Sequence, residues 1–193
     1  MQNKLLNMFD NKKTFSLPFI SRQFEDNNVP LAAKDFTWKL GTKYEKIKYF
    51  IIRFQIHRED NYNNASRFDH CNLETIFVEF NSERYPYECL RCNFTKFNAV
   101  QQFNFVKEFK NSYYQTIKEC IFIDEDIYYY YYPLFVIDVF KQNDRIKNSR
   151  PDITIKATFS KSIPTDAKCY CLILSDSLIE INGDGLRINV KNN

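Results

Sequence analysis

The sequence contains very little glycine. Only 3 of its 193 residues are glycine, where an average usage of about 7% would give roughly 13. A glycine-rich loop that cradles phosphate therefore has almost no residues from which to be built. Tight turns must rely instead on asparagine and aspartate, which tolerate left-handed backbone geometry.

Long apolar runs and a strong excess of one charge are also missing. No window reaches the roughly 18 consecutive apolar residues of a membrane span, and the first ten residues lack the apolar stretch of a signal peptide. With 27 basic and 24 acidic side chains the net charge is +3, too close to neutral to indicate specific nucleic acid or an anionic membrane as a partner. We therefore expect a chain that is made in the cytosol and not secreted, with its six cysteines as free thiols.

Aromatic residues are abundant. There are 19 phenylalanines and 13 tyrosines, and 44% of all residues are hydrophobic. Both aromatic types favour pleated, half-buried surfaces. A chain of this length fits one domain with a sizeable core.

Most apolar residues recur at every second position, which is the spacing of half-buried strands. We expect such strands within 35–40, 49–57, 74–80 and 152–159, and more deeply buried ones at 134–140 and 168–174. A hairpin turn is predicted at 182–185, between strands at 177–181 and 186–190. Residues 1–30 are predicted to form an irregular N-terminal arm with a short helical stretch at 4–9, and residues 31–193 a single domain.

One segment has a different period. Between residues 97 and 113 the apolar side chains are spaced three or four apart, with Phe105 off the stripe, and this predicts an amphipathic helix. The members of the stripe are Phe97, Val100, Phe103, Val106, Phe109 and Tyr113. Eight or so short strands and one inserted helix indicate an all-β fold, a two-sheet antiparallel β-sandwich.

Two cysteine pairs have spacings that could contribute to a zinc site. Cys89 and Cys92 are three apart, and Cys169 and Cys171 share one face of a predicted strand. Because a C-x-C pair is not the usual zinc knuckle and cysteine is often buried, we favour free structural thiols. We predict no structural metal and no cofactor.

Two polar clusters contain residue types that occur in reaction or cation sites. Asp69, His70 and Cys71 combine an acid, a base and a thiol, but adjacent residues of an extended chain point apart, so a polar turn before the next strand is the better interpretation. The acidic run at 124–126 could bind a hard cation, although its spacing favours a solvated loop. We therefore expect no enzymatic activity.

Five consecutive tyrosines occupy positions 128–132. In an extended strand, Tyr129 and Tyr131 would share one face, and Tyr128, Tyr130 and Tyr132 the other. One face would then pack inward, and the other would be available as a protein interface or as a stacking platform for bases or sugars.

The order and spacing of several blocks resemble a known family. The strongest block is Ser66–Leu73, followed by Phe80–Glu83 and then by Tyr85, Pro86 and Tyr87. Weaker blocks are Phe36–Trp38, Pro133–Asp138 and Tyr170–Ile173. Together they resemble the C-terminal jelly roll of double jelly-roll major capsid proteins, above all those of Polinton (Maverick) elements and adintovirus-like sequences. Family members fuse two jelly rolls and this sequence has length for one, which implies a truncated or domesticated genomic copy or a half made separately.

The resemblance implies that residues 31–193 form a single jelly-roll domain. It also implies a structural capsid-type protein that acts by self-assembly, as a homo-oligomer or with a second jelly-roll protein. Its location would be a virion or the cytoplasm or nucleus of the host cell. We expect the interface to include the 97–113 helix and six aromatic or proline residues: Tyr85, Pro86, Tyr87, Tyr128, Tyr130 and Tyr132. The alternative is a non-enzymatic jelly-roll binding module, for carbohydrate or another ligand, that uses the tyrosine run and Trp38.

Overall fold

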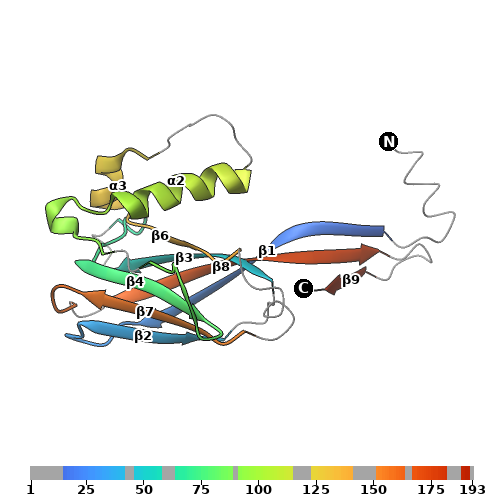
Figure 1. The fold of residues 1–193 in the computed structure, drawn as a ribbon, viewed down its shortest axis with the longest axis horizontal. Helices are drawn as coiled ribbons and strands as arrows, with labels where there is room; N and C mark the ends of the chain where they lie inside the picture. Colours follow the sequence, from blue (N-terminus) through green and yellow to red (C-terminus); the bar gives the residue numbers. More distant parts are fainter. Residues whose placement is uncertain are drawn as a thin grey trace.

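Two antiparallel sheets face each other in the computed structural model, and two helices lie over one side of them (Figure 1). The structure describes residues 15–41, 46–57, 64–88, 91–114, 123–140, 151–163, 167–181 and 188–191. The first sheet has the order β1-β8-β3-β6, with β9 also paired to β8, and the second has the order β2-β7-β4-β5.

The strands of the first sheet are β1 (Phe15–Asn28), β3 (Ile47–Gln55), β6 (Phe135–Asp138), β8 (Lys168–Ile181) and β9 (Ile188–Lys191). Those of the second are β2 (Asp35–Leu40), β4 (Leu73–Phe80), β5 (Glu83–Tyr85) and β7 (Ile153–Phe159). Between β5 and β6 lie a short 3-10 helix, η1 (Phe94–Lys96), and the helices α2 (Val100–Tyr114) and α3 (Glu125–Tyr131).

The pairing of the first eight strands is that of a jelly roll. β1 pairs with β8, β2 with β7, β3 with β6 and β4 with β5, so the chain is one long folded hairpin. Rolling this hairpin up lets β8 also pair with β3, and β7 with β4, which produces two four-stranded layers. The predicted fold, an all-β jelly-roll sandwich with an inserted helix, is confirmed.

The core lies between the two sheets because inward-facing residues alternate along their strands. In β2 and β7 every second residue is buried. Phe54 of β3 sits near the centre with no exposed surface, and its ring meets Phe36, Phe135 and Phe159 with centroids 5.3–6.5 Å apart. These aromatic contacts join the two layers into one rigid frame.

Helix α2 covers the outer face of the first sheet. Phe105 and Phe109 of the helix pack against a second apolar cluster that contains Tyr49 of β3 and Val136 of β6. The predicted helix at 97–113 is confirmed, apart from its first turn. There Phe97 adopts a left-handed conformation (φ 51°) at the end of η1. The predicted stripe of the helix needs correction, because Val100 is 46% exposed whereas Phe105 packs against the sheet.

Three predictions of secondary structure need correction. Residues 15–28 of the predicted irregular arm form strand β1, where Pro18 is tolerated because β1 is at the edge of its sheet. Four of the five consecutive tyrosines, 128–131, lie in helix α3 rather than in a strand, and Tyr132 caps its end. The segments 168–174 and 177–181 are one continuous strand, β8. The predicted helical stretch at 4–9 and the turn at 182–185 lie outside the described residues.

Beyond the sandwich, β1 and β8 continue as a ribbon that projects to one side, accompanied by β9 (Figure 1). The pairing of β8 with β3 ends at Ser175, and past that point the described strand neighbours of β8 are β1 and β9.

Candidate interaction surface

Helical geometry divides the tyrosine run into buried and exposed members. Tyr128 and Tyr129 are 0% and 3% exposed, whereas Tyr130 and Tyr131 are 61% and 39% exposed. Tyr132 is half-buried, with its ring 6.3 Å from that of Phe68. The predicted surface role of Tyr128 is therefore wrong, because consecutive residues of a helix are about 100° apart rather than on alternating faces.

The two buried tyrosines fix α3 to its surroundings. The Tyr128 hydroxyl donates a hydrogen bond to the Leu134 carbonyl at 3.0 Å. The Tyr129 hydroxyl donates to the Phe97 carbonyl at 2.8 Å and accepts one from the Ala99 amide at 2.7 Å. Burial raises the pKa of both phenols, which keeps them neutral. The connection into α2 is thereby held against α3.

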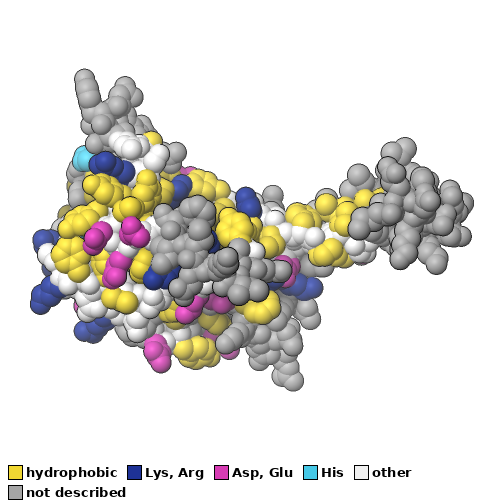
Figure 2. Space-filling model, turned by 90° about the horizontal axis from the view of Figure 1, so that it is seen from above, with side chains coloured by type: hydrophobic (Ala, Val, Ile, Leu, Met, Phe, Trp, Pro, Cys, Tyr) yellow, Lys and Arg dark blue, Asp and Glu magenta, His cyan; other side chains and the backbone are white. Residues whose placement is uncertain are grey.

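The exposed members belong to a cluster that we call the aromatic patch. It consists of Phe97, Ile127, Tyr130 and Tyr131, each between 39% and 61% exposed. Ile127 shares a helix face with the two tyrosines, three and four residues on, and the Phe97 ring lies 5.8 Å from that of Tyr130. The Arg67 guanidinium lies 4.5 Å from the Tyr131 ring. Figure 2 shows hydrophobic side chains gathered on the face that carries the helices.

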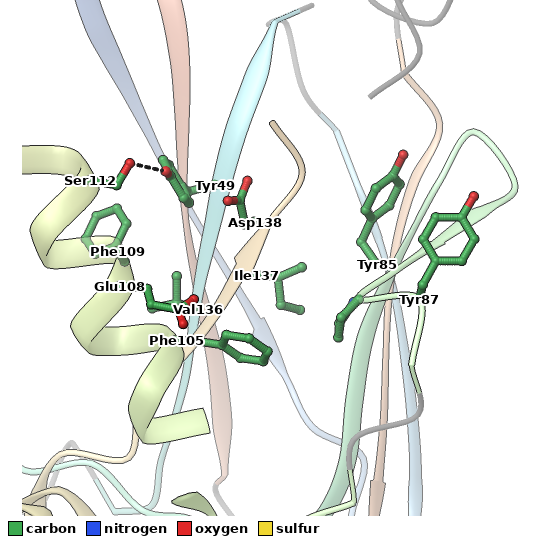
Figure 3. Close-up of a pocket in the computed structure, with 11 residues that line it drawn as sticks. Tyr49, Tyr85, Tyr87, Phe105, Glu108, Phe109, Ser112, Val136, Ile137 and Asp138 are labelled. Carbon is green, nitrogen blue, oxygen red and sulfur yellow. Dashed lines mark hydrogen bonds between the residues drawn. The ribbon is translucent and has the colours of Figure 1, made fainter. Parts of the chain in front are cut away.

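A second feature lies at the open edge of the sandwich, where the edge strands β5 and β6 face each other. A cavity of about 470 Å³ opens there, with α2 on one side and Tyr85, Pro86 and Tyr87 on the other (Figure 3). Tyr87 is 76% exposed, whereas Tyr85 is 6% exposed. Burial, together with a hydrogen bond to Glu83, raises the pKa of Tyr85 to about 12. The cavity thus combines predicted interface residues with the predicted helix.

Asp69, His70 and Cys71 serve the local backbone. The Asp69 carboxylate accepts a hydrogen bond from the Ile56 amide at 2.8 Å, and His70 Nδ1 accepts one from the Asn72 amide at 2.9 Å. The His70 ring stacks on Phe94 at 4.9 Å, and burial lowers its pKa. The structure agrees with the interpretation as a polar turn before strand β4.

The described cysteines are buried. Cys169 and Cys171 share one face of β8, as the alternation predicted, and both are fully buried in the core. Cys92 Sγ donates to the Leu73 carbonyl at 3.2 Å, and burial raises the pKa of this thiol to about 12. Cys89 lies outside the described residues. Within the described part of the chain, no group of three histidine, cysteine or acidic residues is placed to hold a metal ion.

Two further predicted sites are now placed. Trp38 is 8% exposed and its ring packs against Phe36 inside the sandwich, so its suggested role as a ligand contact is wrong. The acidic run is exposed but is not the expected loop, because Glu125 and Asp126 lie in the first turn of α3. Negative charge there interacts favourably with the helix dipole. None of the described helices is long and apolar enough to cross a membrane.

Comparisons with known proteins bear on the family. A model of the double jelly roll-like domain matches residues 2–179. The crystal structure of the mavirus major capsid protein is similar with a TM-score of 0.43 and 10% sequence identity. That match covers 92% of this chain and 41% of the other, so the chain spans about two fifths of that protein's length. No curated protein matches the sequence.

Proposed function

This chain belongs to the double jelly roll-like domain family, and we propose that it is a capsid-type structural subunit. Its activity is association, with copies of itself or with a second jelly-roll protein, in a virion or in the cytoplasm or nucleus of the cell where the shell is built. No catalytic step is part of this proposal. The polar groups of Asp69 and His70 are engaged in local backbone hydrogen bonds, which fits a structural role.

The observation that carries the proposal is the aromatic patch on a jelly-roll frame. The Tyr130 ring lies next to the rings of Phe97 and Tyr131. All four side chains of the patch remain 39–61% exposed. Clustered exposed aromatic residues are typical of protein–protein interfaces rather than of free surface. Arg67 beside Tyr131 adds a second residue type that is enriched at interfaces.

Rigidity makes this patch suited to repeated association. Tyr128 and Tyr129 fix α3 from below by three hydrogen bonds to backbone groups. Little backbone freedom of α3 is then lost when a partner binds, so the part of the entropic cost that comes from ordering the interface is small. A specific contact between two copies would bury roughly 800 Å² on each, which is larger than four side chains provide, so neighbouring residues of α2 and α3 would take part.

Light scattering over a concentration series tests the proposal. We expect the wild-type mass to rise with concentration beyond that of a monomer. Tyr130→Asp should shift this rise to concentrations about tenfold higher, because a carboxylate at the centre of an apolar contact must be desolvated. Tyr87→Asp tests whether the edge of the sandwich takes part as well.

Tyr114→Asp is the matched control. Tyr114 is 64% exposed, close to the 61% of Tyr130, and lies at the opposite end of α2 from the aromatic patch. Circular dichroism of all variants checks that the fold is retained. A wild type that stays monomeric at the highest concentration contradicts self-association. A control that weakens the assembly as much as Tyr130→Asp contradicts the location of the interface.

A further inference from the structure

Two neighbouring cavities form one groove along the open edge of the sandwich. The first has a volume of about 470 Å³ and the second about 410 Å³. They share Pro86, Tyr87, Phe105 and Glu108 as lining residues, so the two cavities adjoin each other. We call it the edge groove. It is separate from the aromatic patch, none of whose residues line it.

The walls of the edge groove are mainly apolar and aromatic. Phe105 and Phe109 of α2 form one wall, Val136 and Ile137 of β6 form the floor, and Tyr87 lies opposite (Figure 3). Each cavity alone falls within the roughly 300–1,000 Å³ of typical ligand sites. Two joined cavities suit a chain segment that places successive side chains in them, rather than a single small group.

Charge in the edge groove has one sign. Glu88, Glu108 and Asp138 line it, whereas no lysine, arginine or histidine is present among the described lining residues. One carboxylate oxygen of Asp138 accepts a hydrogen bond from the Phe140 amide at 2.8 Å, and the residue is exposed. Carboxylates beside aromatic faces attract cations by charge and by the ring quadrupole. The same groups repel phosphate and carboxylate ligands.

We propose that the edge groove binds a segment of a partner protein in which arginine or lysine alternates with aromatic or aliphatic residues. The apolar side chains fill the cavities, and the cations pair with the carboxylates of Glu108 and Asp138 in front of the aromatic walls. This docking activity goes beyond the proposed self-association and depends on a different surface.

Fluorescence anisotropy with labelled peptides tests the proposal. The probe is a six-residue peptide that alternates phenylalanine and arginine, with blocked ends. A second peptide replaces arginine by citrulline, its neutral near-isostere, and a third replaces it by glutamate. Free arginine amide serves as competitor, to separate recognition of a segment from recognition of a lone cation.

Matched protein variants locate the binding. Glu108→Gln combined with Asp138→Asn removes two of the three carboxylates that line the groove, the two proposed to pair with the cations, while keeping side-chain size. The control combines Asp35→Asn with Asp126→Asn, two exposed acids on β2 and α3 that do not line the groove. Both double variants change the net charge by the same amount. Phe105→Ala opens the apolar wall without a change of charge.

We expect the arginine peptide to bind about tenfold more tightly than the citrulline peptide, and the glutamate peptide not to bind. The groove variant should lose this preference, the control variant should keep it, and Phe105→Ala should weaken both the arginine and the citrulline peptides. Equal binding of these two peptides by the wild type, equal losses in the two double variants, or no binding at all overturns the proposal.

If the peptide dissociates an assembled chain, the occupant is a second copy and the inference of a separate partner falls. Self-association is measured independently with Tyr130→Asp, so failure of one proposal leaves the other to its own test.

Discussion

Three neighbouring tyrosines differ in how many hydrogen bonds their hydroxyl groups make, and this provides a graded test of how α3 is held. We consider removal of each hydroxyl in turn: Tyr128→Phe, Tyr129→Phe and Tyr130→Phe. The ring is kept in every case, so the apolar burial and the helix propensity hardly change. Only the polar contact is lost, and the free energy of unfolding should report it.

The expected magnitudes follow from the partners. Tyr128→Phe removes one bond, to the Leu134 carbonyl, and should cost about 1 kcal/mol. Tyr129→Phe removes two hydrogen bonds. It leaves the amide of Ala99, a residue only 1% exposed, without an acceptor for its hydrogen bond. A buried orphaned amide costs about 1–3 kcal/mol, so the total should reach about 2–3 kcal/mol. Tyr130→Phe changes an exposed residue and should stay within about 0.5 kcal/mol.

Urea unfolding monitored by circular dichroism measures the series, with the midpoint compared at a constant slope. The expected order of destabilisation is Tyr129→Phe, then Tyr128→Phe, then Tyr130→Phe. The reasoning is refuted if Tyr129→Phe is no more destabilising than Tyr130→Phe. It is also refuted if the slope changes instead of the midpoint, because the substitution would then alter the unfolded state or the cooperativity.

Two further predictions concern the core and the buried thiols. Phe54→Ala should lower the free energy of unfolding by about 3–5 kcal/mol, because it leaves a cavity between the two sheets. The same urea assay measures this loss, and a value below about 1 kcal/mol would contradict the packing described. Burial raises the pKa of Cys71 and of Cys92 to about 12, against about 8.5 in an unfolded chain. Above pH 8.5 the unfolded state therefore loses these protons first, and stability should fall by about 1.4 kcal/mol per thiol at pH 9.5 relative to pH 7.5. Urea unfolding under reducing conditions measures this change. A midpoint that is the same at both pH values would contradict the predicted loss of stability.

The jelly-roll frame could be predicted from the sequence because its strands bury alternate residues. The alternation in 35–40 and 152–159 identified β2 and β7 within one residue of their observed bounds. Strand β1 was missed since its outer half projects from the sandwich and carries Pro18, so neither alternation nor composition marks it. Which strands pair could not be read from periodicity, because pairing is set by contacts between distant parts of the chain.

The tyrosine run shows why the candidate surface was harder to predict. Tyrosine favours strands, and five in a row offer no apolar–polar contrast that would reveal a period of 3.6. The helix is stabilised by hydrogen bonds to residues outside it. The carbonyls of Phe97 and Leu134 accept hydrogen bonds from its two buried hydroxyl groups, and the Ala99 amide donates one. Tertiary contacts therefore outweigh local propensity here, and they also decide which tyrosines reach the surface.

Both proposed contact surfaces depend on the same part of the chain, the excursion between β5 and β6. The frame's edge strands come from 83–85 and 135–138, and the residues between them supply the aromatic patch and one wall of the edge groove. The excursion contributes Phe103, Tyr128 and Tyr129 to the main core, and α2 packs Phe105 and Phe109 against the outer face of the first sheet. Its exposed residues belong to neither contact, so they can change without opening the core. Substitution of Tyr130 or Glu108 should then alter association with little loss of stability, whereas Phe54 or Tyr129 should alter stability first. This separation follows from the layered architecture: the eight strands fix the shape, and the excursion between two edge strands determines what that shape binds.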